Sequence, residues 1–189
     1  MRLPDLTPEQ LDADQRAVYD DIVGGPRGSV PLHFPLTTAT GALTGPFGVM
    51  VHEPSLGRPL QELGSAIRYR TGLSARVREI AILAVAAATD CAFERHAHER
   101  VGRAVGLTHG EVAALASGSF TSADRVERSS YDLCRRLLDG SPRLTDAEYA
   151  ELAAGLGATT ITELTVLVGY YRTLADLLAV FDVRVHPAQ

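Results

Sequence analysis

Residues 73–98 read LSARVREIAILAVAAATDCAFERHAH, and this stretch decides the fold. Its first half repeats apolar residues at helical spacing after Ser74, which is well placed to cap a helix that runs to about residue 88. Asp90 then predicts the start of a second helix over residues 91–105, and Gly106 stands where helices commonly end in a left-handed residue. Two consecutive helices are therefore expected at the centre of the chain.

The sequence on both sides of this stretch also shows the signals of α-helices. Threonine precedes glutamate by three residues at three places, and each of these capping boxes opens a new apolar pattern. No hairpin signal and no alternating period typical of a strand is present. The sequence thus predicts an all-α protein of about seven or eight helices. The boxes are Thr108-x-x-Glu111, Thr145-x-x-Glu148 and Thr160-x-x-Glu163, and further helices are expected from Pro8 to about Ile22 and over residues 55–70, 122–139 and 161–180.

Residues 24–48 form the one long irregular stretch, because their prolines and glycines disfavour both helix and strand. A loop of this length is usually functional or lies against a partner. We expect residues 1–44 to form an N-terminal helix with a Pro/Gly-rich extension, and residues 45–189 to form a compact helical domain.

Composition excludes several classes of function. The 189 residues carry a net charge of −5, and all 18 positive residues are arginine, so no lysine is present to form a Schiff base. The absence of tryptophan and the acidic balance argue against a protein that binds nucleic acid through phosphate contacts and base stacking. Two well-separated cysteines, Cys91 and Cys134, provide no disulfide framework, and no signal peptide or membrane-spanning run is recognisable, so we expect a cytoplasmic protein.

Three polar side chains share one face of the second central helix. At about 100° per residue, Cys91, Glu94 and His98 fall within an arc of about 60°, whereas His96 points away. Glu94 and His98 are four residues apart, close enough for the carboxylate to orient the imidazole. The start of a helix also favours a thiolate at Cys91.

The spacing of these residues resembles that of the carboxymuconolactone decarboxylase and alkyl hydroperoxidase D-like family. Glu79 is followed by eleven residues, Cys91, two residues, Glu94, three residues and His98. In the peroxidase branch of that family a second cysteine stands where this chain has Glu94, so a vicinal disulfide cannot form here. The resemblance implies an alkyl hydroperoxidase D-like fold, with Glu79 as a buried proton-relay carboxylate, His98 as the imidazole and Cys91 as the first thiol.

The resemblance favours an enzyme that does acid–base chemistry on a small organic acid or carbonyl compound: decarboxylation, isomerisation or lactone chemistry. His98 would be the general acid and base, Glu94 would orient it, Glu79 would complete the relay, and Cys91 would line the pocket or assist. An arginine is the natural anchor for an acidic substrate. The candidates for substrate binding are Arg68, Arg70 and Arg95.

Two other functions remain open. Cys91 could serve a thiol peroxidase, with an external resolving thiol or with Cys134. Alternatively, the chain could be a non-catalytic helical assembly module, since the apolar last helix and the long early loop suit contacts between subunits. The resemblance implies homo-oligomers, from dimers to trimers and hexamers.

Ordinary structural roles are also open for each site residue. Glu79 could pair with Arg76 or Arg78, Cys91 could be a small buried apolar residue, and His98 an inert core histidine. No cofactor is expected. A metal site is not expected either, because no further ligand motif accompanies the helix. The expected partners are a small-molecule substrate and further copies of the chain, with no nucleic acid and no membrane.

Overall fold

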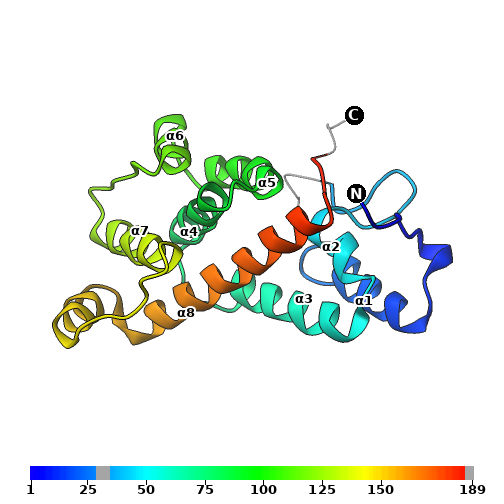
Figure 1. Cartoon of the computed structure of the whole chain (residues 1–189), viewed down its shortest axis with the longest axis horizontal. Coiled ribbons are helices and arrows are strands. Elements are labelled where there is room, and N and C mark those ends of the chain that lie inside the picture. Colours follow the sequence, from blue (N-terminus) through cyan, green and yellow to red (C-terminus); the bar gives the residue numbers. More distant parts are fainter. Residues whose placement is uncertain (29–34, 186–189) are drawn as a thin grey trace. The chain divides into compact units, whose positions relative to one another are not determined.

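The computed structural model describes residues 1–28 and 35–185, and within these ranges the protein is all α-helical (Figure 1). The described residues form eight α-helices and one short 3-10 helix, and their β structure is limited to an isolated bridge between Thr37 and Leu43. The all-α prediction is confirmed. The elements are η1 (Pro8–Gln10), α1 (Ala13–Val23), α2 (Gly45–Met50), α3 (Pro54–Tyr69), α4 (Ala75–Ala88), α5 (Ala92–Ala104), α6 (His109–Ser117), α7 (Arg125–Leu138) and α8 (Asp146–Val180).

The chain divides into two compact units. One consists of Met1–Arg70 with Asp176–Gln189, in which α1 and α2 both pack on α3. The other is Thr71–Ala175, in which α4 packs against α5, α6 and α7. The boundary at residues 44 and 45 that the sequence suggests stays a prediction.

Helix α4 is the central core element of the second unit. The Ser74 hydroxyl accepts a hydrogen bond from the Val77 amide, as the cap prediction required. From Glu79 to Ala86 every residue is buried. Because alanine is small, neighbouring helices can approach α4 closely, and the larger isoleucine and leucine side chains fill the space between them. A carboxyl group at position 79 is therefore carried into the interior.

The start of α5 differs from the prediction. Asp90 is not the N-cap: its φ is +48°, and Cys91, with an extended backbone, occupies the N-cap position. The cause is the shortness of the connection, since the Cys91 amide donates to the Ala86 carbonyl oxygen at 2.9 Å, which requires a left-handed residue just before it. The thiol therefore lies at the junction of the two central helices.

The N-terminal segment also departs from the prediction. Thr7 and Gln10 form the expected capping box, but the box opens only a single 3-10 turn. The helix proper starts after Asp12, whose side chain accepts from the Gln15 amide at 2.9 Å. The irregular stretch ends earlier than expected, because α2 begins at Gly45, and part of that stretch, residues 29–34, lies outside the described residues.

Helix α8 begins where the Thr145 box predicts, with the Glu148 side chain accepting from the Thr145 amide at 2.7 Å. The Thr160 box is wrong as a helix start: the chain breaks at Gly157, with φ 77° and ψ 155°, and Thr160 lies inside the helix that follows. Glycine adopts this conformation without steric cost, so the break falls on Gly157. By length and composition α8 could cross a membrane, but a core helix passes the same test and this one is interrupted.

Candidate active site

The candidate site lies within the unit Thr71–Ala175 and is assembled from three helices. Glu79 comes from α4, Glu94 and His98 come from α5, and Tyr171 comes from α8. All four are buried, with Glu79 0% and His98 5% exposed. Buried ionisable groups are costly unless they are paired, so their contacts decide what the site can do.

His98 is held between two carboxyl groups. Its Nδ1 lies 2.6 Å from Glu79 Oε2, and its Nε2 lies 3.3 Å from Glu94 Oε2. The expected approach of Glu79 to His98 is therefore confirmed, and so is the pairing across one turn of α5. Because both ring nitrogens face oxygen, the imidazole has a donor role on each side when it is protonated.

The carboxyl groups determine the charge of the ring. Burial on its own would lower the pKa of His98, but the charge and hydrogen bonds of Glu79 and Glu94 outweigh it and raise the pKa from 6.5 to about 9. At neutral pH the ring is thus an imidazolium, which donates to both carboxylates.

Cys91 lies at the start of α5, on the same helix as the histidine. Burial raises the pKa of its thiol, and the nearby Glu94 charge adds to the increase. The backbone amides of Glu94 and Phe93 act in the opposite direction and lower the pKa, but they are outweighed. The expectation that the helix start favours a thiolate is therefore wrong in its net effect, because desolvation dominates.

The second cysteine, Cys134, is more deeply buried than Cys91. Cys134 on α7 is fully buried, and burial raises its thiol pKa to about 12. Both cysteines are free thiols. A thiol that is so strongly protonated and so fully enclosed is poorly suited to act as a resolving nucleophile.

Tyr171 is the site residue that the sequence did not single out. Its ring meets the His98 ring edge to face, with centroids 5.4 Å apart and planes at 89°, and Tyr170 packs on it in the same manner at 5.2 Å. In the sequence Tyr171 is only one of several apolar residues at helical spacing. The one signal in the sequence was a tyrosine among leucines in an apolar helix. This signal does not show which helix the tyrosine ring contacts.

Of the three arginines expected to bind substrate, Arg95 is the one that belongs to the same compact unit as His98. Arg95 is 41% exposed on α5, with its guanidinium 3.8 Å from the exposed Asp90. Arg68 and Arg70 belong to the end of α3, in the other compact unit. Their roles in substrate binding stay predictions. His96, expected to point away from the trio, is half-buried.

No metal site is evident from the geometry of the described ranges. Among residues 1–28 and 35–185, no group of three or more histidine, cysteine, aspartate and glutamate side chains is arranged to hold a metal ion. Glu79, His98 and Glu94 are arranged as a row, with the imidazole between the carboxyl groups.

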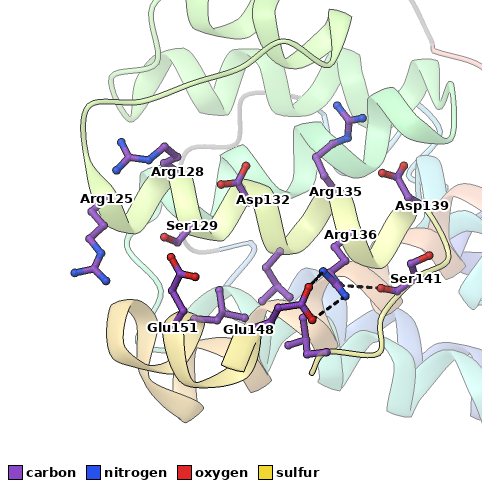
Figure 2. A pocket seen from close by; sticks show the side chains of 13 residues that line it. Arg125, Arg128, Ser129, Asp132, Arg135, Arg136, Asp139, Ser141, Glu148 and Glu151 are labelled. Carbon is purple, nitrogen blue, oxygen red and sulfur yellow. Dashed lines mark hydrogen bonds and ion pairs between the residues drawn. The ribbon is translucent and has the colours of Figure 1, made fainter. Parts of the chain in front are cut away.

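A cavity of about 730 Å³ lies elsewhere, between α7 and the first part of α8 (Figure 2). Its charges are matched: four arginines face four acidic residues, and Arg136 is bonded to Glu148 at 2.9 Å. A groove whose charges already compensate each other is poorly suited to bind a charged ligand. Its walls contain no residue of the row Glu79, His98 and Glu94.

Residues 54–133 match the model of the carboxymuconolactone decarboxylase family, which confirms over that segment the resemblance found in the sequence. The matched segment contains Glu79, Cys91, Glu94 and His98. No curated protein matches the chain.

Solved structures share the fold. An uncharacterized peroxidase-related protein from Ralstonia eutropha with an alkylhydroperoxidase AhpD core superposes with a TM-score of 0.75 at 16% identity, over 98% of this chain and 92% of that chain. A protein of unknown function from Agrobacterium tumefaciens, a putative antioxidant defence protein AhpD, superposes with a TM-score of 0.63 at 18% identity, over 73% of this chain and 94% of that chain. A variant of the debrominase Bmp8 with one cysteine replaced by alanine, in complex with 2,3,4-tribromopyrrole, superposes with a TM-score of 0.72 at 13% identity, over 98% of this chain and 92% of that chain. At these identities the likeness establishes the alkyl hydroperoxidase D-like helical fold.

Proposed function

We propose that this chain, whose residues 54–133 match the carboxymuconolactone decarboxylase family, is an enzyme that transfers protons at carbon in a small organic acid, lactone or carbonyl compound. The observation that carries the proposal is the buried row Glu79, His98, Glu94, with the imidazole bonded on both sides. An arginine between two carboxylates only joins helices, whereas the histidine of this row carries a proton that it can release toward a second carboxyl group.

The row suggests a role for each member. Glu79 is fully buried and holds Nδ1, so it positions and charges the ring. Since Nε2 faces Glu94 Oε2, a substrate reaches the proton of His98 through the Glu94 carboxyl group. Glu94 therefore exchanges the proton with the substrate, and His98 supplies and receives it.

This arrangement suits chemistry in which negative charge develops next to a carbonyl. When a carboxylate leaves as carbon dioxide, or when a proton leaves carbon, an enolate forms and must be stabilised and reprotonated. The imidazolium provides a positive charge in a site closed to water, and the carboxylic acid formed at Glu94 returns the proton to carbon. Cys91, as a neutral thiol, would line the pocket.

The proposal is tested by a panel of lactone acids and β-keto acids, with carboxymuconolactone among them, in deuterated water. NMR would record both product formation and deuterium entering the carbon skeleton. We expect one or more compounds to exchange or decarboxylate, and His98→Ala and Glu94→Gln to abolish the signal. Exchange that is as fast in both variants as in the unaltered protein would exclude the row as the catalytic unit.

A second candidate function, thiol-based reduction of a peroxide or a halogenated compound, is favoured by one observation. Cys91 is the N-cap of α5, where the amides of Phe93 and Glu94 lie near the sulfur. The raised pKa of the thiol and the enclosed state of Cys134 weigh against it. Peroxide consumption that depends on Cys91, and a mass spectrum showing oxidised Cys91, would promote this function.

Assembly and location are part of the proposal. Several apolar side chains of α8, such as Val166 and Val180, are exposed in the single chain, which is consistent with a homo-oligomer. The oligomer can be measured by sedimentation. We also propose a cytoplasmic location, since both cysteines are free.

A further inference from the structure

Another cavity, of about 360 Å³, lies in the unit Thr71–Ala175, between the second half of α4, the end of α6 and α7. Its volume falls within the range of small-molecule sites. No residue of the row Glu79, His98 and Glu94 lines it, so the candidate active site does not account for it. Its walls combine apolar side chains with polar groups from α7, which are those of Tyr131, Arg135 and Asp139.

The apolar floor of this cavity consists of Ala84, Ala87 and Ala88. These three side chains share one face of α4, since residues three and four apart are neighbours on a helix. Leu115 on α6 and Leu138 on α7 extend the apolar wall. Because the side chain of alanine is a single methyl group, the space above α4 stays open and can receive an apolar group of a ligand.

Arg135 is held at the cavity by two contacts. Its Nη1 donates to the Gly118 carbonyl oxygen at 2.8 Å and to the Tyr131 hydroxyl at 3.4 Å. Glycine is needed at position 118, because its φ is +73° and a Cβ there would lie 2.9 Å from Arg135 Nη1. Among the described residues, no acceptor lies within hydrogen-bond distance of Arg135 Nε or Nη2. These donors are therefore available to an anion.

The Tyr131 hydroxyl provides a further donor. Tyr131 is 5% exposed, and its ring packs edge to face on Phe120 with centroids 5.2 Å apart. Its oxygen accepts from Arg135, but its hydrogen has no acceptor within residues 1–28 and 35–185. A buried hydroxyl can donate as well as accept, so this donor is unused. A carboxylate in the cavity would receive hydrogen bonds from both the guanidinium and the hydroxyl.

Asp139 brings the opposite charge to the same cavity. It is the C-cap of α7, where a carboxylate faces the negative end of the helix dipole, an unfavourable place for an acidic residue. Figure 2 marks no ion pair between Asp139 and the arginines drawn there. It also shows Asp139 and Arg135 extending from α7 on the side opposite Glu148 and Glu151, away from the larger cavity that they also border. Asp139 and the end of α7 therefore suit an ammonium group.

We propose that this cavity binds a free α-amino acid with an apolar side chain. Arg135 and Tyr131 hold its carboxylate, Asp139 holds its ammonium group, and the apolar floor of α4 contacts its side chain. A ligand with a single charge would leave either Arg135 or Asp139 without a partner, so these residues select the zwitterion. The site is separate from the row and does not depend on the proposed function.

Binding is measured by isothermal titration calorimetry, with L-leucine as the probe. Two analogues each remove one charge: L-leucinamide lacks the carboxylate, and 4-methylpentanoate lacks the ammonium group. We expect L-leucine to bind saturably and each analogue to bind about tenfold or more weakly. Glycine keeps both charges but lacks the apolar side chain, so it should also bind more weakly than L-leucine.

Three variants test the assigned contacts. Arg135→Gln and Asp139→Asn should each weaken the binding of L-leucine by about tenfold or more. Tyr131→Phe, which keeps the ring that packs on Phe120, should weaken it by about threefold to tenfold. Arg128→Gln removes an exposed arginine of α7 that does not line this cavity, so this matched control should bind L-leucine as the unaltered protein does. Circular dichroism checks that each variant is folded.

Ala88→Leu tests the site with every charge in place. Ala88 is exposed at the edge of the floor, so a larger side chain there should fill the cavity without disturbing the core, and L-leucine should no longer bind. This variant also keeps the test valid if Arg135→Gln fails to fold.

The inference is overturned if L-leucine does not bind, if it binds equally to Asp139→Asn, or if either single-charge analogue binds as tightly. Binding that is lost in His98→Ala but kept in Ala88→Leu would place the ligand at the row and would also overturn it.

Discussion

Two charged clusters that include residues of α4 have the same formal composition, one cation with two carboxyl groups, and they behave differently. In one, Arg76 bonds to Glu111 from α6 and Glu127 from α7. In the other, His98 from α5 lies between Glu79 and Glu94. Hydrogen bonds to Glu127 and Glu111 raise the pKa of Arg76 still further, so its charge is permanent. The pKa of His98 is raised only to about 9, within reach of ordinary solution pH.

The identity of the cation decides what such a charged cluster can do. An arginine fixes three helices to one another but cannot lose a proton under physiological conditions. A histidine in the same setting also joins helices, and in addition it holds a proton that can be passed on. The Arg76 cluster is therefore expected to affect stability alone, and the His98 cluster both stability and activity.

The largest effect is expected from His98→Ala. Activity on a compound that the panel identifies should fall by about a hundredfold to ten-thousandfold, the usual worth of general acid–base transfer. Steady-state kinetics measures the loss, and circular dichroism controls for folding. If His98→Ala kept most of its activity, the difference between the two clusters would be structural only.

Stability should depend on pH through His98 and not through Arg76. The folded-state pKa of His98 is raised from 6.5 to about 9, so its stabilising contribution is fully present below pH 6.5 and is lost as pH rises through 9. The expected loss is up to about 3 kcal/mol in the free energy of unfolding. Urea unfolding at several pH values measures it, and a flat profile between pH 6.5 and 9 would contradict the assigned charge.

Arg76→Gln should destabilise the protein by about 2 kcal/mol, a value reduced for partial exposure, because Glu127 and Glu111 lose their shared partner. Urea unfolding at neutral pH measures this loss. The substitution should leave the kinetic constants nearly unchanged once the folded fraction is accounted for. A large fall in turnover would show that the two clusters are coupled through α4.

The smallest effect is expected at Tyr171. Its ring packs against His98, and an aromatic neighbour favours a cationic ring by about 0.5–1 kcal/mol. Tyr171→Leu should therefore lower the pKa of His98 by less than about one unit, and Tyr171→Phe should preserve it. NMR titration of the His98 ring is the measurement, and Tyr131→Leu, which alters another buried tyrosine in an aromatic pair, is the control.

Much of this architecture could be predicted from the sequence, because the signals are local. Ser74, Thr108 and Thr145 cap helices as expected, since an N-cap requires only residues within one turn of each other. The 60° arc likewise brings Glu94 to His98, because both lie on one helix.

The predictions that were wrong or missing depend on contacts between helices, which the local sequence does not show. Asp90 looks like a cap, but the tight connection from α4 places the extended residue at Cys91 instead. The thiolate expectation failed because desolvation depends on the packing of several helices around Cys91. Tyr171 could not be singled out, because its edge-to-face contact with His98 exists only once α5 and α8 are packed.

The most direct test of proton transfer through the His98 row compares two substitutions on α5 in one assay. The rate of deuterium incorporation into an active substrate is measured for Glu94→Gln and for Cys91→Ser. We expect Glu94→Gln to lose about a hundredfold or more and Cys91→Ser to stay within about tenfold of the unaltered enzyme. A Cys91→Ser variant without activity, beside a Glu94→Gln variant of nearly normal rate, would show that the thiol is the catalyst and would contradict the assignment of the row.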